Sequence, residues 1–145
     1  MEIDDLIEMY ENDKREKTAL SKYAYDLNQH CFLPVRKAAK ACRFDIDICD
    51  SEEIENRLFE NGYALFVNPY KVCNKIISEY LKTECTEDDR VYFRKLKKEK
   101  DNIVISFLWY FDHKDGLESF EEFENKKLTE MLSDWCKKYG LKLES

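Results

Sequence analysis

Residues 44–67, FDIDICDSEEIENRLFENGYALFV, contain three different sequence patterns in succession. The first five residues alternate apolar side chains with aspartates, which is typical of a half-buried strand. Asp50 and Glu53 then form a capping-box pattern that predicts a helix, which Gly62 ends. The last five residues, YALFV, are apolar throughout and predict a strand in the centre of a sheet. We therefore expect a right-handed β-α-β crossover with parallel strands.

The rest of the chain predicts helices on both sides of this segment. Apolar residues recur at helical spacing through the first thirty residues and predict one long helix or two nearly continuous ones. Pro34 and Pro69 suit the first turns of two further helices. Ser119 and Glu122 form a second capping box at the start of the strongest amphipathic pattern in the chain, which Gly140 closes.

A basic cluster lies between two apolar runs in VYFRKLKKEKDNIVISFLWYF, residues 91–111. Residues 90–97 and 103–112 are predicted as two strands of a hairpin, because the Asp-Asn pair in the connecting KEKDN favours a turn. The predicted element order is therefore N-terminal helices followed by β-α-β-α-β-β-α. This is an α+β fold with a small mixed sheet and helices packed on it.

The length and composition are those of one ordinary domain. Hydrophobic residues make up 43% and aromatic residues 14% of the chain, with only 3 Gly and 2 Pro, which predicts an aromatic core and short loops. We expect a single domain over residues 1–145, with a helical part at 1–43 and an α+β core at 44–145. Six cysteines without a C-x-x-C pair indicate reduced thiols in the cytoplasm. The acidic N-terminus and the lack of a long apolar run argue against a signal peptide and a membrane partner.

The formal net charge of -7 argues against a general nucleic-acid binder, because a polyanion meets a repulsive field. Three acidic clusters place carboxylates beside aromatic and aliphatic side chains, which suits a protein interface. We expect a non-enzymatic binding or inhibitor protein, such as an anti-host or anti-defence regulator of a phage or mobile element, that acts on a partner protein with a basic surface. The residues expected to bind it are Asp4, Asp5, Asp45, Asp47, Glu52, Glu53, Glu121 and Glu122.

The basic cluster gives a first alternative, a nucleic-acid-binding module that uses the predicted hairpin. Lysine and arginine side chains at a hairpin tip contact phosphates in some such modules, and the same charges would suit an acidic protein or a nucleotide phosphate. A solvated turn that protects a sheet edge is the simpler interpretation. The residues of this alternative are Arg94, Lys95, Lys97, Lys98 and Lys100.

Cys49 gives a second alternative, a thiol or small-ligand-binding protein. It follows the predicted strand and precedes the predicted helix, and a helix N-terminus lowers the pKa of a thiol. The surrounding carboxylates of Asp47, Asp50, Glu52 and Glu53 oppose this effect, because negative charge favours the neutral thiol.

Two further short motifs are compatible with chemistry. His113 lies in the predicted turn DHKDG, where the neighbouring aspartates would suit a histidine that acts as a general base. A loop histidine without a catalytic role is the simpler interpretation. Asp45 and Asp47, two apart on a predicted strand, suit Mg²⁺ or Ca²⁺, although such pairs are common on solvent-facing strands. The sequence has no glycine-rich phosphate loop and no other known catalytic motif, so no catalytic residue, metal or cofactor is assigned.

Overall fold

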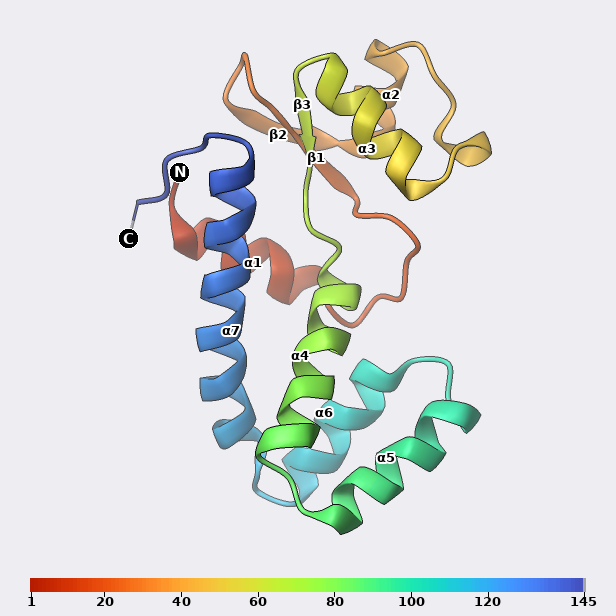
Figure 1. The fold of residues 1–145 in the computed structure, drawn as a ribbon, viewed down its shortest axis with the longest axis vertical. Coiled ribbons are helices and arrows are strands. Elements are labelled where there is room, and N and C mark those ends of the chain that lie inside the picture. The colour runs from red at the N-terminus through yellow and green to blue at the C-terminus, as the bar shows by residue number, and fades with distance from the viewer. Residues whose placement is uncertain (145) are drawn as a thin grey trace. The chain divides into compact units, whose positions relative to one another are not determined.

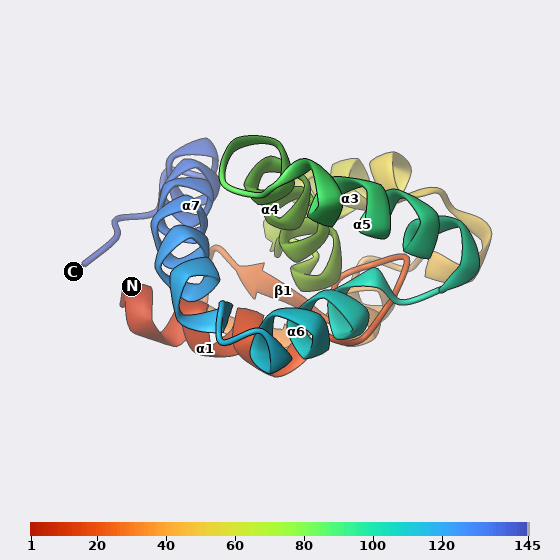
Figure 2. The ribbon, with the colours of Figure 1, turned by 90° about the horizontal axis from the view of Figure 1, so that it is seen from below.

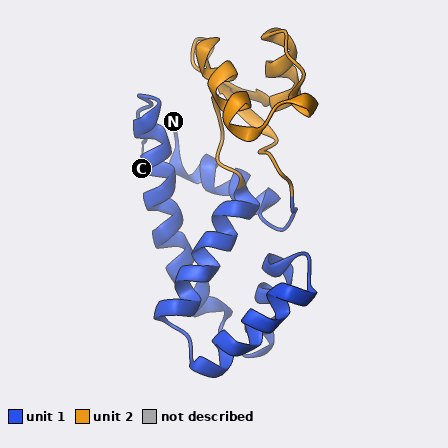
Figure 3. Ribbon diagram, turned by 45° about the vertical axis from the view of Figure 1, so that its right-hand side comes forward, with its two compact units in different colours: residues 1–17, 69–145 blue, residues 18–68 orange. Residues whose placement is uncertain are grey.

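The computed structural model describes residues 1–144 and divides the chain into two compact units (Figures 1 and 3). Unit 1 contains residues 1–17 and the chain from residue 69 onwards, and unit 2 contains residues 18–68. The α+β class predicted from the sequence is confirmed, with helices and a small sheet. The internal division expected after residue 43 falls inside unit 2 rather than between the units.

Unit 1 is helical. Helix α4 (Pro69–Thr83) contacts each of the other four helices described in this unit. Figure 2 shows α4 between α7 and α5. Its Tyr80 ring meets four phenylalanine rings edge-on, which is a favoured aromatic geometry. Those rings belong to Phe107, Phe111, Phe120 and Phe123. The helices are α1 (Ile3–Asp13), α4 (Pro69–Thr83), α5 (Glu87–Glu99), α6 (Ile103–His113) and α7 (Leu117–Lys138).

The predicted hairpin of residues 90–97 and 103–112 is wrong, because both segments are helical. The side chains of Thr86 and Asn102 each accept a hydrogen bond from the backbone N–H three residues on, so each residue caps a helix instead of forming a turn. The phenylalanines of both segments then lie on the buried face of an α5–α6 pair, whereas Tyr92 and Trp109 are exposed. Phe93 and Phe107, for example, are buried with ring centroids 5.2 Å apart.

A buried polar cluster joins α1, α4 and α7 inside unit 1. The Glu124 carboxylate accepts hydrogen bonds from the Tyr10 hydroxyl at 2.6 Å and from the Lys14 ammonium at 3.1 Å, and the Cys73 thiol lies 3.7 Å away. Lys14 also pairs with Glu11 at 2.8 Å. Burial lowers the pKa of Lys14, but its hydrogen bond to Glu11 and the charge of Glu124 outweigh this and raise it overall. The cluster therefore holds a buried ammonium in its charged form.

Unit 2 combines an antiparallel sheet with short helices. The sheet has the strand order β2-β1-β3, and Ala24 of the central strand lies opposite Leu33 and Leu65. Helix α2 packs on β1 and β2, and α3 packs on β3. Their shared core contains Ala24, Val35, Ala38, Ile54 and Leu58. The elements are β1 (Tyr23–Asp26), β2 (Cys31–Pro34), α2 (Val35–Ala41), a 3₁₀ turn η1 (Ile46–Ile48), α3 (Ser51–Glu60) and β3 (Tyr63–Leu65).

Four predictions for the segment up to residue 67 are wrong. The helix expected through the first thirty residues stops at Asp13, and the chain then forms the β1–β2 hairpin, where the Asp26 carboxylate accepts two backbone N–H groups of the turn. The alternating FDIDI segment forms η1 because the Asp45 side chain accepts the N–H of Asp47. Without that strand there is no parallel crossover. The sheet is antiparallel rather than mixed, and β3 is an edge strand rather than a central one.

The predicted helices with clear boundary signals are confirmed. Asp50 caps α3, and Gly62 follows that helix with a φ of +87°, a left-handed conformation that glycine adopts without strain. Helices α2 and α4 begin next to the two prolines, as expected. Helix α7 is also confirmed, but Ser119 lies inside it instead of capping it, and its hydroxyl accepts a hydrogen bond from Tyr80.

Candidate functional site

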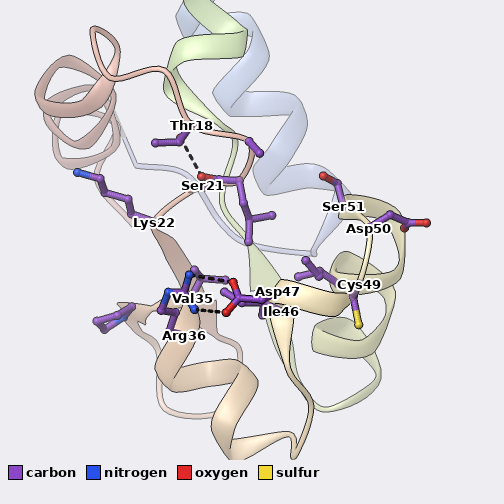
Figure 4. A pocket seen from close by; sticks show the side chains of 14 residues that line it. Thr18, Ser21, Lys22, Val35, Arg36, Ile46, Asp47, Cys49, Asp50 and Ser51 are labelled. Carbon is purple, nitrogen blue, oxygen red and sulfur yellow. Dashed lines mark hydrogen bonds and ion pairs between the residues drawn. The ribbon is translucent and has the colours of Figure 1, made fainter.

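A cavity with a volume of about 750 Å³ lies entirely within unit 2 (Figure 4). Three segments form its walls: residues 18–22 before β1, residues 34–36 at the start of α2, and residues 46–54 around η1 and α3. Leu20, Val35, Ile46 and Ile54 give it a mainly apolar lining. A cavity of this size and character fits an apolar side chain or a small organic ligand.

Local hydrogen bonds fix the wall formed by residues 46–54. The Asp45 carboxylate accepts the N–H of Asp47 at 2.9 Å and starts η1, and the Asp50 carboxylate accepts the N–H of Glu53 at 2.8 Å and starts α3. The two aspartate caps thus fix the backbone conformation before and after Cys49. The acidic residues that suggested a strand are here needed to build the wall of the cavity.

Arg36 and Asp47, which both line this cavity, form an ion pair (Figure 4). The Arg36 guanidinium donates to both carboxylate oxygens of Asp47, at 3.1 and 3.3 Å. Its hydrogen bond and charge lower the pKa of Asp47, which keeps that carboxylate ionised. Both side chains are more than half exposed, and exposed pairs of this kind add little to stability. A ligand can therefore displace either partner without unfolding the unit.

Ile48 lies between two residues that line the cavity and is 82% exposed. An isoleucine this exposed gains nothing from the hydrophobic effect in the free protein, and it gains about 2 kcal/mol when a partner covers it. Phe59, on α3 of the same unit, is 54% exposed. An exposed aliphatic side chain therefore belongs to the same short segment as one wall of the cavity.

Cys49, the predicted reactive thiol, lines the cavity and is half-buried. Desolvation and then the negative charge of Glu53 raise the pKa of Cys49, so the thiol stays protonated at neutral pH. This opposes the activation expected from its position before a helix. The role of Cys49 as a reactive thiol stays a prediction.

The structure brings together only some of the acidic residues predicted to bind a partner. Asp45 immediately precedes η1 and Asp47 lies within it. Glu52 and Glu53 follow in the first turn of α3, where Glu53 pairs with Arg57 at 3.1 Å. The other four belong to unit 1. Asp4 and Asp5 lie in the first turn of α1, and Glu121 and Glu122 lie on the exposed side of α7.

The basic residues lie on and after helix α5 rather than on a hairpin. Lys97, Lys98 and Lys100 line a hollow together with Lys17, whereas Arg94 and Lys95 do not line it. His113 ends α6 with its Nδ1 atom 2.8 Å from the Trp109 carbonyl oxygen. Asp45 and Asp47 do not share a strand face, and within residues 1–144 no group of three or more His, Cys, Asp or Glu side chains is placed to hold a metal ion.

The sequence did not indicate two walls of the cavity, residues 18–22 and 34–36, or the role of Arg36 in the ion pair with Asp47. Residues 18–22 carry no motif, and Arg36 follows Pro34 in a short helix without any pattern that links it to Asp47. No signal in the sequence reports this pairing, because it depends on how α2 and η1 fold against each other.

Comparisons with known proteins give no relative: no family model, no curated protein and no solved structure matches the chain. Among the helices of residues 1–144, none has both the length and the apolar character needed to cross a membrane. The function must therefore be argued from the geometry of the chain itself.

Proposed function

We propose that this chain is a binding protein without enzymatic activity and that the cavity of unit 2 receives an apolar side chain of a partner protein. The observation that carries the proposal is the apolar hollow of about 750 Å³ beside Ile48, which is 82% exposed. Interface hot spots have this form, in which an anchor side chain fills a pocket and a neighbouring apolar residue excludes water.

The charges around the cavity support a partner with a basic surface. Asp45, Asp47, Asp50 and Glu52 lie within one short stretch beside the cavity, and of these only Asp47 is held in a salt bridge described for residues 1–144. Complementary charge increases the rate of association and selects among partners. We therefore propose that lysine or arginine residues of the partner flank its anchor side chain and meet this acidic edge.

The biological setting belongs to the same proposal. The six cysteines are free thiols in the structure, which suits a reducing cytoplasm. An inhibitor that a phage or mobile element directs against a host or its defences is a setting in which a small binding protein acts without catalysis. Adding the purified chain to the captured partner and measuring the partner's own activity tests the inhibitory role.

The proposal is tested by affinity capture from an extract of the source cells with site variants as bait. Ala19 is exposed and lines the cavity, so Ala19→Trp fills the hollow without disturbing the core. Ile48→Ser removes the exposed contact, and Phe59→Ser is the matched control away from the cavity lining.

We expect a protein captured by the wild type and by Phe59→Ser to be lost with Ala19→Trp and with Ile48→Ser. Capture should also weaken when the salt concentration rises, because salt screens the acidic edge. Equal capture by all four baits would show that the cavity is not the binding site. Failure of the wild type to capture any protein would contradict the proposed function.

A further inference from the structure

A second hollow lies in unit 1, where α5 ends and α6 begins, and has a volume of about 410 Å³. Four lysines surround it: Lys97 and Lys98 from the last turns of α5, Lys100 just after them, and Lys17 from the segment that follows α1. The polar side chains of Tyr70 and Asn74, one turn apart on α4, complete the lining with Glu99, Asp101 and Ile103.

The charges of this hollow are unbalanced in a protein whose formal net charge is -7. The lining contains four lysines and two acidic residues, of which Lys17 and Asp101 neutralise each other in a salt bridge, so three lysines remain against Glu99. No salt bridge among residues 1–144 includes Lys97, Lys98 or Lys100. Because these lysines line the same hollow, an anion that enters it can interact favourably with more than one of them.

Helix geometry explains only part of this arrangement. Lysines in the last turn of a helix interact favourably with its carbonyl end, and this interaction accounts for the positions of Lys97 and Lys98. Lys17 and Lys100 lie outside helices, and they converge on the same hollow from two distant parts of the sequence. The Tyr70 hydroxyl donates to the Asp101 carbonyl oxygen at 3.4 Å, and the Asn74 side-chain amide adds a neutral hydrogen-bonding group to the lining of the hollow.

We propose that this hollow binds a compact polyphosphate group, such as a diphosphate or triphosphate. Lysine ammonium groups bind phosphate as point charges, and charge-assisted hydrogen bonds to phosphate oxygens are among the strong ones. The volume lies in the range of small-ligand sites. A long nucleic-acid strand fits less well, because Arg94 and Lys95 lie outside the lining and the acidic protein as a whole repels an extended polyanion.

This site is independent of the protein-binding cavity, because all its residues belong to unit 1. The test is a calorimetric titration of the full chain with inorganic tripolyphosphate at low salt. Lys97→Gln with Lys100→Gln removes two charges from the lining. Arg94→Gln with Lys95→Gln removes two charges from the same helix outside the lining and is the matched control.

We expect the lining variant to weaken tripolyphosphate binding by about tenfold or more and the control variant to change it by less than about twofold. A single-stranded 20-base oligonucleotide should bind more weakly than tripolyphosphate. Equal losses in the two variants would show a diffuse attraction rather than a site and would overturn the proposal. Failure of the wild type to bind tripolyphosphate, or tighter binding of the oligonucleotide, would overturn it as well.

Discussion

Replacing Glu124 by glutamine should destabilise unit 1 by about 3 kcal/mol, because the change leaves the Lys14 ammonium in the interior with less compensation. Glu124 and Lys14 are 3% and 4% exposed, and the carboxylate contacts the ammonium with both oxygens at 3.1 Å. Removing one partner of a buried pair costs about 3–5 kcal/mol. The lower end applies here because Lys14 keeps its contact with Glu11 at 2.8 Å.

A second substitution in the same cluster should reverse most of this loss. Lys14→Met removes the uncompensated charge, and the amide that Glu124→Gln introduces still offers an oxygen to the Tyr10 hydroxyl, which donates to Glu124 at 2.6 Å in the wild type. The double variant should therefore be more stable than Glu124→Gln alone, by about 2 kcal/mol. Glu121→Gln, an exposed change on the same helix, should stay within about 0.5 kcal/mol of the wild type.

Urea unfolding at pH 7, followed by tryptophan fluorescence, measures these differences. Both tryptophans, Trp109 and Trp135, belong to unit 1, so the signal reports the unit that contains the cluster. With a urea dependence of roughly 1–3 kcal/mol per molar, the midpoint of Glu124→Gln should fall by about 1–3 M. A loss below about 1 kcal/mol, or a double variant less stable than Glu124→Gln, would refute the view that the cluster is a tightly coupled buried ion pair.

Two further predictions concern titratable groups. Burial raises the pKa of Asp89, but hydrogen bonds from Lys114 and Tyr110 outweigh this effect and lower the pKa overall. The stability that this carboxylate adds is therefore present above about pH 4 and is lost as the pH falls through the pKa of the folded state. Asp89→Asn should therefore flatten the acid side of a plot of urea midpoint against pH, and a plot unchanged from the wild type would contradict the assignment. Because the pKa of Cys49 is raised, iodoacetamide should alkylate it at pH 7 more slowly than it alkylates free cysteine, as measured by mass spectrometry. A faster rate would support the reactive-thiol alternative.

The sequence predicted those helices whose ends carry their own signals. Asp50 with Gly62, and Pro69 with the apolar stripe that follows, locate α3 and α4 because capping and turn residues act locally. The α5–α6 pair was missed because residues 103–111 are apolar at almost every position and therefore have no helical period to detect. Thr86, three residues before Asp89, was an available sign of a helix start.

The candidate sites were predictable only where one local segment supplies them. Asp47 and Cys49 were singled out and do line the cavity, since they belong to the single stretch that forms one wall. Arg36 was not, because its pairing with Asp47 depends on packing between segments that the sequence does not show to be neighbours. The lysine hollow likewise needs Lys17, which lies far along the chain from α5.

The interruption of unit 1 by residues 18–68 also has a consequence for the order in which we expect that unit to assemble. Helices α4 to α7 follow one another with short connections, so they meet through local contacts that form quickly. Helix α1 reaches α4 and α7 only after a loop of roughly 50 residues has closed, at an entropic cost of roughly 3–4 kcal/mol. We therefore expect the amino-terminal helix to dock after α4 to α7 have met. Weakening its buried contacts at Leu6 or Tyr10 should then hasten unfolding and leave the refolding rate almost unchanged.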